Sequence, residues 1–266
     1  MENNKSSKGN LNSVFALGLI LTAVVVAHLI FYFIMGSASH FNEKGEALSG
    51  DYLGMMYKGG FIVPFLMSFF IIVLGVSIER GITIVKAFGK SSLSGFVSAI
   101  NAKLSANDID GAISLCNTHQ GSVGNVTHEV LNRYRVVASD SGLTKDKKLD
   151  AIQKEVEEAT MLELPALEKN LTIISTLASV STLFALLGTV IGMIKAFAAL
   201  ATTGNPDPSA LANGISEALI NTALGIFTSA IAIVAYNFFT SKVDDLTHKI
   251  DEIGFSIRQH FIANGK

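Results

Sequence analysis

Residues 171–200 read LTIISTLASVSTLFALLGTVIGMIKAFAAL and contain a single charged side chain, Lys195. Three further runs are similarly apolar, at residues 14–35, 61–78 and 215–240, the last with one charge at Glu217. A helix of about 20 apolar residues crosses a hydrocarbon core about 30 Å thick. Because the backbone must satisfy its own hydrogen bonds in lipid, unbroken runs of this kind predict helices. The sequence therefore predicts a polytopic membrane protein with four spans.

Composition agrees with this class and excludes several others. Of the 266 residues 49% are apolar and only 16% are charged, below the roughly 25% that is usual for soluble domains. The net charge of −2 and the lack of a dense basic cluster predict no nucleic-acid partner. Cys116 is the only cysteine, which excludes an intramolecular disulfide and is simplest to place in a reducing compartment.

No sequence motif points to catalysis or to a bound cofactor. The six histidines have no metal-ligand spacing with Cys116 or with acidic pairs. The chain has no glycine-rich phosphate loop, nucleophile elbow or HExxH helix. We therefore expect no enzyme activity, no cofactor and no metal. His28, inside the first run, is expected to pack or to form a local hydrogen bond.

The distribution of Lys and Arg predicts the orientation. Residues 79–170 contain eleven of the 20, and the tail after residue 240 contains four. The segment 36–60 contains only Lys44 and Lys58, and residues 201–213 contain none. Since cytoplasmic segments carry the positive excess, both termini and the long middle segment are predicted to be cytoplasmic.

The first run has two possible readings. Lys5 and Lys8 precede it, and residues 37–39 resemble the small-residue site of a cleaved signal peptide. Signal h-regions are about 7–15 residues long, however, and this run is longer. We therefore favour an uncleaved membrane anchor.

The charged segments are predicted to be helical. Leu149, Ile152, Val156 and Ala159 are spaced 3-4-3 between charged residues, as in an amphipathic helix that continues into the third span with a kink at Pro165. The tail repeats this pattern at Val243, Leu246, Ile250, Ile253 and Ile257. This seam either packs against the chain's own helices or joins two subunits. Residues 107–108 and 140–142 are typical of turns. The predicted fold is all-α, with long transmembrane helices that extend into a cytoplasmic helical bundle.

Small and hydroxyl side chains recur every three or four residues along the last two spans. They are Ser175, Ser179, Thr182, Ala185, Thr189, Gly192 and Ala196 in the third span, and Ala218, Asn221, Thr222, Gly225, Ser229, Ala232 and Tyr236 in the fourth. Such stripes allow close helix packing, and their hydroxyls can also bond across helices or hold water. Either role is open at any single position.

The two charged residues of these spans have separate interpretations. A carboxylate in a membrane span is costly unless it faces a bundle interior or water, so Glu217 is a functional candidate. Lys195 lies near the end of its span, where its long side chain can reach the interface. We favour an interfacial anchor for Lys195; the alternative is a partner for Glu217.

Three ordered motifs resemble a known family. They are LLGTVIGMI at residues 186–194, GISEALINTALG at 214–225 and AYNFF at 235–239. Glu79-Arg80 after the second run also resembles the end of the family's first shared helix. Over residues 60–255 the chain thus resembles the MotA/TolQ/ExbB proton channel family, with the closest likeness to ExbB.

The resemblance implies a homopentamer in the bilayer, whose last two helices line a pore around an ExbD/TolR-like single-span protein. In such a motor, ion flow drives rotation, and a TonB-like protein is the further partner. The expected ion is the proton, and the alternative is sodium, which hydroxyl groups also coordinate. Matched to the motifs and the polar stripes, the predicted ion-pathway residues are Thr182, Thr189, Glu217, Asn221, Thr222 and Ser229. Gly188, Gly192 and Gly225 are the predicted packing residues.

The implied domain organisation has six parts. They are an N-terminal extension with an extra transmembrane helix (1–40), a periplasmic loop (41–60), a transmembrane helix (61–79), a cytoplasmic helical domain (80–170), a pore-lining transmembrane hairpin (171–240) and a cytoplasmic C-terminal helix (241–266). The family commonly has proline where this chain has Thr182 and Ile231, and glycine in place of Ala185. Without those prolines the two helices are expected to be straighter.

Three functions follow from these features. One is an ExbB-like subunit of an inner-membrane motor that energises TonB-dependent transport across the outer membrane. The second is a TolQ-like subunit that serves envelope integrity, and the third is a membrane scaffold that conducts no ions. We favour the first, because both long motifs are close to those of ExbB. The hydroxyl stripes and Glu217 argue against a scaffold, which has no need of a polar interior.

Overall fold

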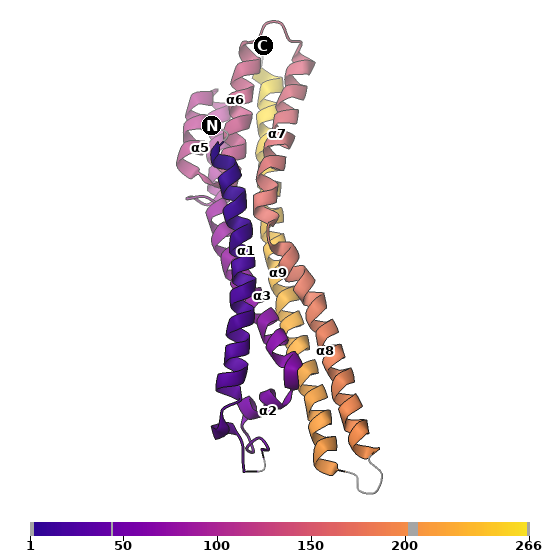
Figure 1. The fold of residues 1–266 in the computed structure, drawn as a ribbon. Helices are drawn as coiled ribbons and strands as arrows, with labels where there is room; N and C mark the ends of the chain where they lie inside the picture. Colours follow the sequence, from indigo (N-terminus) through magenta and orange to yellow (C-terminus); the bar gives the residue numbers. More distant parts are fainter. Residues whose placement is uncertain (1–2, 44, 202–206, 265–266) are drawn as a thin grey trace. The chain divides into compact units, whose positions relative to one another are not determined.

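The computed structural model describes residues 3–43, 45–201 and 207–264, with side chains described from residue 16 onward. Within these ranges the chain is almost entirely helical (Figure 1), with one isolated bridge between Phe41 and Ala47 and no β-strand. The predicted all-α fold is confirmed. Lys44 and residues 202–206, which belong to the predicted outer loops, lie outside the described residues.

The long helices follow the apolar and amphipathic runs of the sequence. They are α1 (Asn3–Leu29), α3 (Val63–Ala87), α4 (Leu93–Ser105), α5 (Ile109–His119), α6 (Gly121–Ser139), α7 (Lys145–Glu168), α8 (Leu171–Leu200) and α9 (Pro208–Asn264). Short elements link α1 to α3: the π-helical turn η1 (Ile30–Met35), the 3₁₀ turn η2 (Ala38–His40), α2 (Tyr52–Lys58) and the 3₁₀ turn η3 (Gly60–Ile62). Among the described residues, four helices are long and apolar enough to cross a membrane, in agreement with the four predicted spans.

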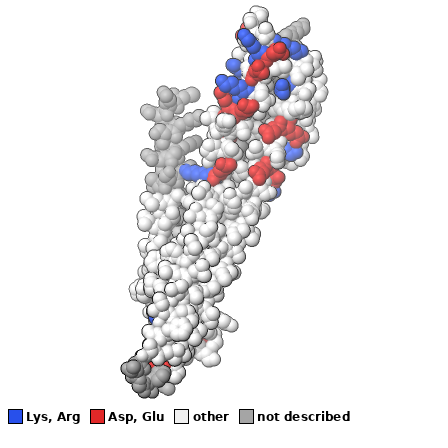
Figure 2. Space-filling view, turned by 90° about the vertical axis from the view of Figure 1, so that its right-hand side faces the viewer, with Lys and Arg blue, Asp and Glu red and all other residues white. Residues whose placement is uncertain are grey.

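The chain divides into two compact units. The membrane unit comprises Met1–Ile78 and Asn170–Tyr236, and the bundle unit comprises Glu79–Lys169 and Asn237–Lys266. The helices α3 and α9 each contribute to both units. In the space-filling view (Figure 2), charged side chains gather on the bundle unit, while the visible face of the membrane unit has almost none. This contrast in charge is what a division between lipid-facing and water-facing parts requires.

Small residues set the packing inside the membrane unit. Ala23 and Ala27 of α1 are almost completely buried, and a Cβ atom at Gly75 of α3 would lie 2.8 Å from Cδ1 of Leu19. The helices α8 and α9 lie side by side (Figure 1). A Cβ atom at Gly192 would lie 2.7 Å from the backbone nitrogen of Ala218. Helices without large side chains between them can approach this closely, which increases dispersion contacts in lipid.

The link between the first two spans folds against the hairpin. Phe31 and Met35 of η1 form a buried apolar cluster with Val63, the first residue of α3. Ile220 of α9 packs against this cluster, and the Phe31 ring stacks on Tyr57 of α2 with ring centroids 4.7 Å apart. The end of the first span, the short helix α2 and α9 therefore share one apolar core.

The bundle unit buries the two amphipathic seams against each other. Ile152 and Val156 of α7 are buried, and a Cβ atom at Gly254 of α9 would lie 3.0 Å from Cγ1 of Val156. All five predicted seam residues of the tail are buried within this single chain: Val243, Leu246, Ile250, Ile253 and Ile257. Of the two readings of the seam, the structure shows packing against the chain's own helices.

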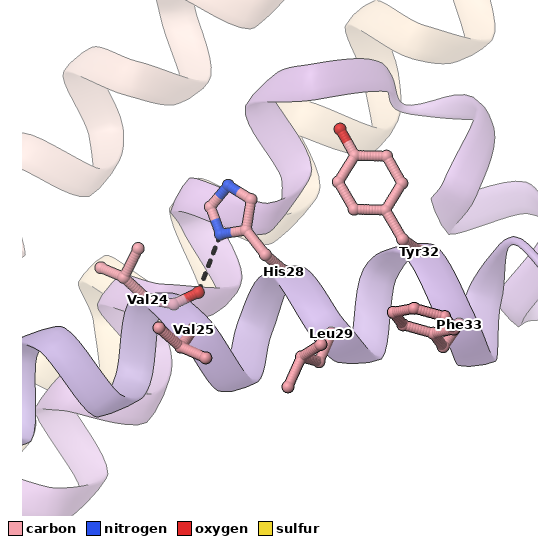
Figure 3. A pocket seen from close by; sticks show the side chains of 6 residues that line it. All are labelled: Val24, Val25, His28, Leu29, Tyr32 and Phe33. Atoms are coloured by element: carbon pink, nitrogen blue, oxygen red, sulfur yellow. Dashed lines mark hydrogen bonds between the residues drawn. The ribbon is translucent and has the colours of Figure 1, made fainter.

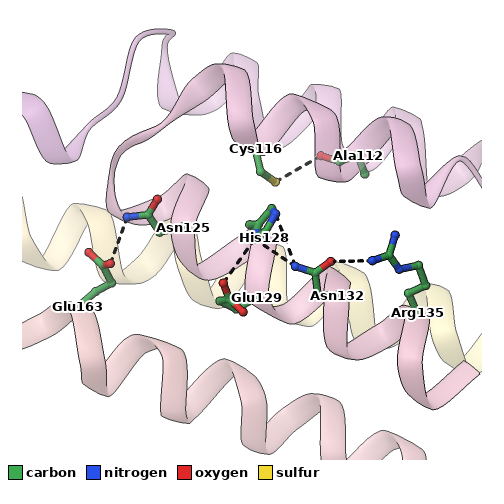
Figure 4. Close-up of polar contacts among 8 residues, drawn as sticks. All are labelled: Ala112, Cys116, Asn125, His128, Glu129, Asn132, Arg135 and Glu163. Atoms are coloured by element: carbon green, nitrogen blue, oxygen red, sulfur yellow. Dashed lines mark hydrogen bonds and ion pairs between the residues drawn. The ribbon is translucent and has the colours of Figure 1, made fainter. Parts of the chain in front are cut away.

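Polar contacts at the bundle surface supplement this core (Figure 4). The Asn125 amide of α6 donates a hydrogen bond to Glu163 of α7 at 3.1 Å.

On α5, the Cys116 thiol is buried and donates to the carbonyl oxygen of Ala112 at 3.3 Å. Burial raises the pKa of the Cys116 thiol to about 12. The only thiol of the chain is therefore protonated and inaccessible in the folded bundle.

The prediction that α7 runs into the third span with little interruption is confirmed, since only Lys169 and Asn170 separate α7 from α8. The helix α7 includes Pro165 and ends at Glu168, and Asn170 then adopts a left-handed conformation with φ +64°. Nη1 of Arg80 donates hydrogen bonds to the carbonyl oxygens of Ala166 and Leu167, at 3.1 and 3.3 Å. These carbonyls have no helical partner at a helix end, so the buried guanidinium caps α7 where it stops.

Candidate functional site

The hairpin of α8 and α9 brings together most of the predicted site residues. The predicted packing residues Gly188, Gly192 and Gly225 all lie in the α8–α9 contact. A Cβ atom at Gly188 would lie 2.6 Å from Cβ of Asn221. Because a methyl group does not fit in this gap, glycine is what allows the polar residues of α8 and α9 to meet.

Thr189 and Thr222 form a hydroxyl pair across the hairpin. Their Oγ1 atoms lie 2.5 Å apart, and each hydroxyl also lies 3.0 Å from a carbonyl oxygen of its own helix, Ala185 or Ala218. Three hydrogen bonds of this kind need three protons, whereas two hydroxyls supply only two. One of the three contacts must therefore lack a proton at any moment, and the two hydroxyls can exchange the roles of donor and acceptor.

The other predicted ion-pathway residues have different surroundings. Asn221 is fully buried, and its Nδ2 donates to the carbonyl oxygen of Gly59 at 2.9 Å. Ser229 is buried and donates to the carbonyl oxygen of Ala178 at 2.5 Å. Thr182 is partly exposed. Within one chain, Asn221 thus joins α9 to the backbone at Gly59, and Ser229 joins α9 to α8. A pore-lining role for both residues stays a prediction.

Glu217 and Lys195 form an ion pair. Nζ of Lys195 lies 2.7 and 2.8 Å from the two carboxylate oxygens of Glu217. The Glu217 side chain is 8% exposed and that of Lys195 is 52% exposed. Of the two readings of Lys195, the structure shows the partner of Glu217 rather than a separate interfacial anchor.

The polar stripe predicted along α8 divides into two faces. Ala185, Gly192 and Ala196 are buried against α9, together with Ser181 and Gly188, which the stripe did not include. Its hydroxyl members lie beside this face and are partly or largely exposed: Ser175, Ser179, Thr182 and Thr189. Sequence spacing alone could not separate the buried residues from the exposed hydroxyl residues, because residues three and four positions apart lie on both sides of a helix face.

Sequence reasoning also missed the glycine pair that precedes the second span. Gly60 has φ +77°, and a Cβ atom there would lie 2.5 Å from Oε1 of Glu217. The neighbouring Gly59 is buried and accepts the hydrogen bond from Asn221. The sequence did contain a signal for this corner, namely two adjacent glycines directly before an apolar run. Such a pair permits a sharp turn and a close approach of the backbone to other groups.

His28 lies in a shallow groove formed by α1 and η1 (Figure 3). The groove has a volume of about 300 Å³ and is lined by Val24, Val25, His28, Leu29, Tyr32 and Phe33. Nδ1 of His28 lies 2.8 Å from the carbonyl oxygen of Val24, which can only accept, so Nδ1 carries the proton. The predicted local hydrogen bond is confirmed. Among the described residues, no group of three or more His, Cys, Asp and Glu side chains could hold a metal ion.

Together these features define a polytopic helical membrane protein with a glycine-packed hairpin that contains a hydroxyl pair and an ion pair. Residues 123–252 match the model of the MotA/TolQ/ExbB proton channel family. This match covers just under half of the chain and confirms the resemblance seen in its motifs. The matched residues include both hairpin helices and much of the bundle unit.

Individual relatives carry both ExbB and TolQ names. The chain is 25% identical over 199 residues to a protein of Methanothermobacter thermautotrophicus described as a biopolymer transport protein ExbB homolog, covering 74% of this chain and 66% of that one. It is 34% identical over 105 residues to the Tol-Pal system protein TolQ of Pseudomonas aeruginosa, covering 40% and 46%. It is 26% identical over 133 residues to the biopolymer transport protein ExbB of Xanthomonas campestris pv. campestris, covering 50% and 53%. The chain thus spans between 46% and 66% of the length of these relatives.

Proposed function

We propose that the chain is an ExbB-like subunit of an inner-membrane, proton-driven motor that energises TonB-dependent transport across the outer membrane. In this proposal five copies form a pore around an ExbD-like single-span partner, and both termini are cytoplasmic. The family domain and the four apolar helices support a membrane channel subunit. The ExbB relatives support the assignment within the family.

The observation that carries the proposal is the Thr189–Thr222 pair. A scaffold needs only apolar packing, yet this hairpin brings two hydroxyls to within 2.5 Å of each other inside an apolar span. Hydroxyls that can exchange donor and acceptor roles can pass a proton or orient water for one. A carboxylate on a partner helix that faced these hydroxyls would have a hydrogen-bond partner in each of its protonation states.

The chain also has the exposed surface that assembly with other helices would need. Along α8 the exposed apolar side chains are Leu183, Leu186, Leu187, Val190, Ile194 and Phe197. Along the membrane part of α9 they include Ile215, Leu219, Ile226, Phe227, Ile233 and Val234. In a pentamer some of these side chains would contact neighbouring copies and the rest would face lipid or the partner helix.

A TolQ-like role in envelope integrity is the second candidate. It is favoured by identity, since the chain is 34% and 39% identical to the TolQ proteins of Pseudomonas aeruginosa and Haemophilus influenzae, over 105 and 108 residues. The two roles share the same pore and differ in the partner. The partner that co-purifies from the native host would therefore distinguish them.

Native mass spectrometry of the purified complex, co-expressed with its candidate single-span partner, tests the proposal. We expect five copies of this chain to retain a small number of partner chains. A monomer or dimer that ignores the partner would exclude the motor and favour the non-conducting scaffold. The same preparation in vesicles should admit protons, as read from an enclosed pH-sensitive dye.

A further inference from the structure

Glu217 lies where three elements of the membrane unit meet. Both of its carboxylate oxygens accept hydrogen bonds from the Lys195 ammonium, at 2.7 and 2.8 Å. Lys195 belongs to the last turns of α8, and Glu217 belongs to the early turns of α9. The ion pair therefore joins the two helices near the end of the hairpin at which the chain passes from one to the other.

The third element is the Gly59–Gly60 corner, where α2 ends and η3 begins. A Cβ atom at Gly60 would lie 2.5 Å from Oε1 of Glu217, so the corner backbone lies directly against the carboxylate. One turn further along α9, Nδ2 of the fully buried Asn221 donates to the carbonyl oxygen of Gly59 at 2.9 Å. The carboxylate is thus enclosed by an ammonium on one helix and by backbone from another segment.

The residues on both sides of this corner share an apolar cluster with α9. Met56 of α2 and Ile220 of α9 pack against the same buried cluster, which contains Val63 at the start of α3. Phe31 and Met35, at the end of the first span, complete that cluster. An apolar contact and a polar contact therefore hold the corner against one stretch of α9, residues 217–224.

We infer that Glu217 is a positioning residue, a fixed carboxylate that holds the end of the hairpin against the Gly59–Gly60 corner. The inference rests on the proposed ion pathway and gives Glu217 a different role in it from that of Thr189 and Thr222. A side chain that carries a translocated ion must exchange it with water or with a partner group. Both oxygens of Glu217 are instead occupied by Lys195, and only 8% of its side chain is exposed.

The chemistry of the pair predicts how it responds to substitution. Removing Lys195 leaves the Glu217 carboxylate, which is 8% exposed, without a compensating charge, whereas replacing both residues by neutral groups removes that penalty. Glutamine has almost the shape of glutamate, and two glutamines can still form one hydrogen bond. If Glu217 only holds the hairpin against the corner, the neutral glutamine pair restores this contact. If Glu217 carries an ion, no change at Lys195 can replace the missing carboxylate.

A double-mutant cycle with Lys195→Gln, Glu217→Gln and the double variant tests this inference. The first readout is the apparent unfolding temperature of the chain in detergent, which needs no partner and no ion flux. We expect each single variant to unfold roughly 2–4 °C below the wild-type chain and the double variant to recover most of that loss. Additive losses in the double variant would overturn the assignment of the junction.

The second readout is proton flux into dye-loaded vesicles that contain the complex and its single-span partner. We expect each single variant to lose roughly fivefold or more and the double variant to regain several-fold over both. Loss of flux in every variant that lacks the carboxylate, whatever stands at position 195, would make Glu217 an ion carrier and overturn the inference. Absence of flux with the wild-type chain would instead contradict the proposed function, and the unfolding cycle would still decide the role of Glu217.

Discussion

Gly60 occupies a backbone conformation that side chains with a Cβ atom rarely adopt. Its φ is +77°, and a Cβ atom would fall 2.5 Å from Oε1 of Glu217. Gly50, at the other end of α2, has a similar φ of +82° but has nothing within 4 Å of its Cβ position. The two glycines therefore separate the effect of backbone strain from the effect of steric contact with the ion pair.

We predict that Gly60→Ala destabilises the protein more than Gly50→Ala does. Both variants should lose about 1 kcal/mol from left-handed strain. Gly60→Ala should lose about 1–3 kcal/mol more, because the new methyl group displaces a carboxylate that is already paired. Thermal unfolding in detergent measures the difference. Equal losses would mean that Glu217 moves aside freely and is not fixed at the corner.

His119 is a buried base in the bundle unit. Its ring stacks on Phe96 with centroids 4.0 Å apart, and its Nδ1 lies 2.6 Å from Oγ of Ser91. Nε2 is buried and has no hydrogen-bond partner among the described residues. Burial therefore disfavours the protonated ring and lowers the pKa of His119 below its usual value of 6.5.

The lowered pKa of His119 predicts a loss of stability in acid. Below pH 6.5 the unfolded chain binds a proton that the folded chain refuses, so the free energy of unfolding falls until the pH reaches the folded-state pKa. His119→Asn can keep the hydrogen bond to Ser91 without titrating, and should reduce this pH dependence between pH 5 and 7. The part that remains is due to His260, whose pKa burial also lowers. The matched control is His128→Asn, at a partly exposed position on α6, which should leave the dependence in place. A wild-type chain equally stable at both ends of this window would contradict the assignment.

At the scale of single elements, the end of α7 depends on one side chain. The Arg80 guanidinium donates to the last carbonyls of α7 and also pairs with Glu79, and its side chain is only 3% exposed. Arg135 forms a comparable ion pair with Asp110 at the bundle surface, where its side chain is 59% exposed. The two arginines therefore compare a buried helix cap with an exposed pair in the same unit.

We predict that Arg80→Ala lowers the free energy of unfolding by about 3–5 kcal/mol, because it removes a buried charge and the hydrogen-bond donor of two carbonyl groups at the end of α7. Arg135→Ala should cost about 0–1 kcal/mol, as is usual for exposed pairs. Denaturant unfolding of the full chain followed by circular dichroism would measure both. Similar costs for the two variants would show that the α7 end is capped adequately by water.

The hydroxyl pair belongs to the hairpin as a whole. Thr189→Val keeps the shape of the side chain and removes the hydroxyl that faces Thr222. If this pair passes protons, we expect flux to fall by roughly tenfold, the effect of about 1.4 kcal/mol on a barrier. Thr176→Val, at an exposed position on another face of α8, is the control and should leave flux within about twofold. A proton-flux assay in vesicles compares them, and equal effects of the two changes would refute the pathway.

The helices were predictable to the extent that their patterns are local. Apolar runs gave the four spans, and the 3-4-3 spacing in α7 and the tail gave the seam of the bundle unit. The end of α7 was not predictable in this way, because it depends on Arg80, which is far away in sequence. Pro165 suggested a kink, yet the helix continues through it and ends at Glu168.

At the scale of the whole molecule, the sequence predicted several residues of the site but not all of the contacts between them. The motifs named Thr189, Thr222 and Glu217, and the structure brings the two threonines into contact. The pairing of Glu217 with Lys195 was left as the lesser alternative, because a lysine near the end of a span reaches the interface equally well. The corner at Gly59 and Gly60 escaped notice, since only the folded chain brings residues 59 and 217 together.

The orientation of the whole chain is directly testable. In the predicted topology Ser49 is outside the cytoplasm and Ser141 is inside, and both residues are exposed. We predict that Ser49→Cys reacts with a membrane-impermeant maleimide in intact cells, whereas Ser141→Cys reacts only after the membrane is opened. The wild-type chain, whose Cys116 is buried, should stay unlabelled in both conditions. The reverse pattern would invert the topology.

The same buried thiol bears on how this protein would withstand oxidative stress. Peroxide attacks thiolates, and Cys116 is held as a protonated thiol inside the bundle, so it should escape conversion to sulfenic acid. The sulfur most open to attack among those with described side chains is then in a methionine such as Met161, which is 69% exposed. Methionine sulfoxide is reversible by dedicated reductases. Oxidative damage to this chain would therefore fall mainly on a repairable residue.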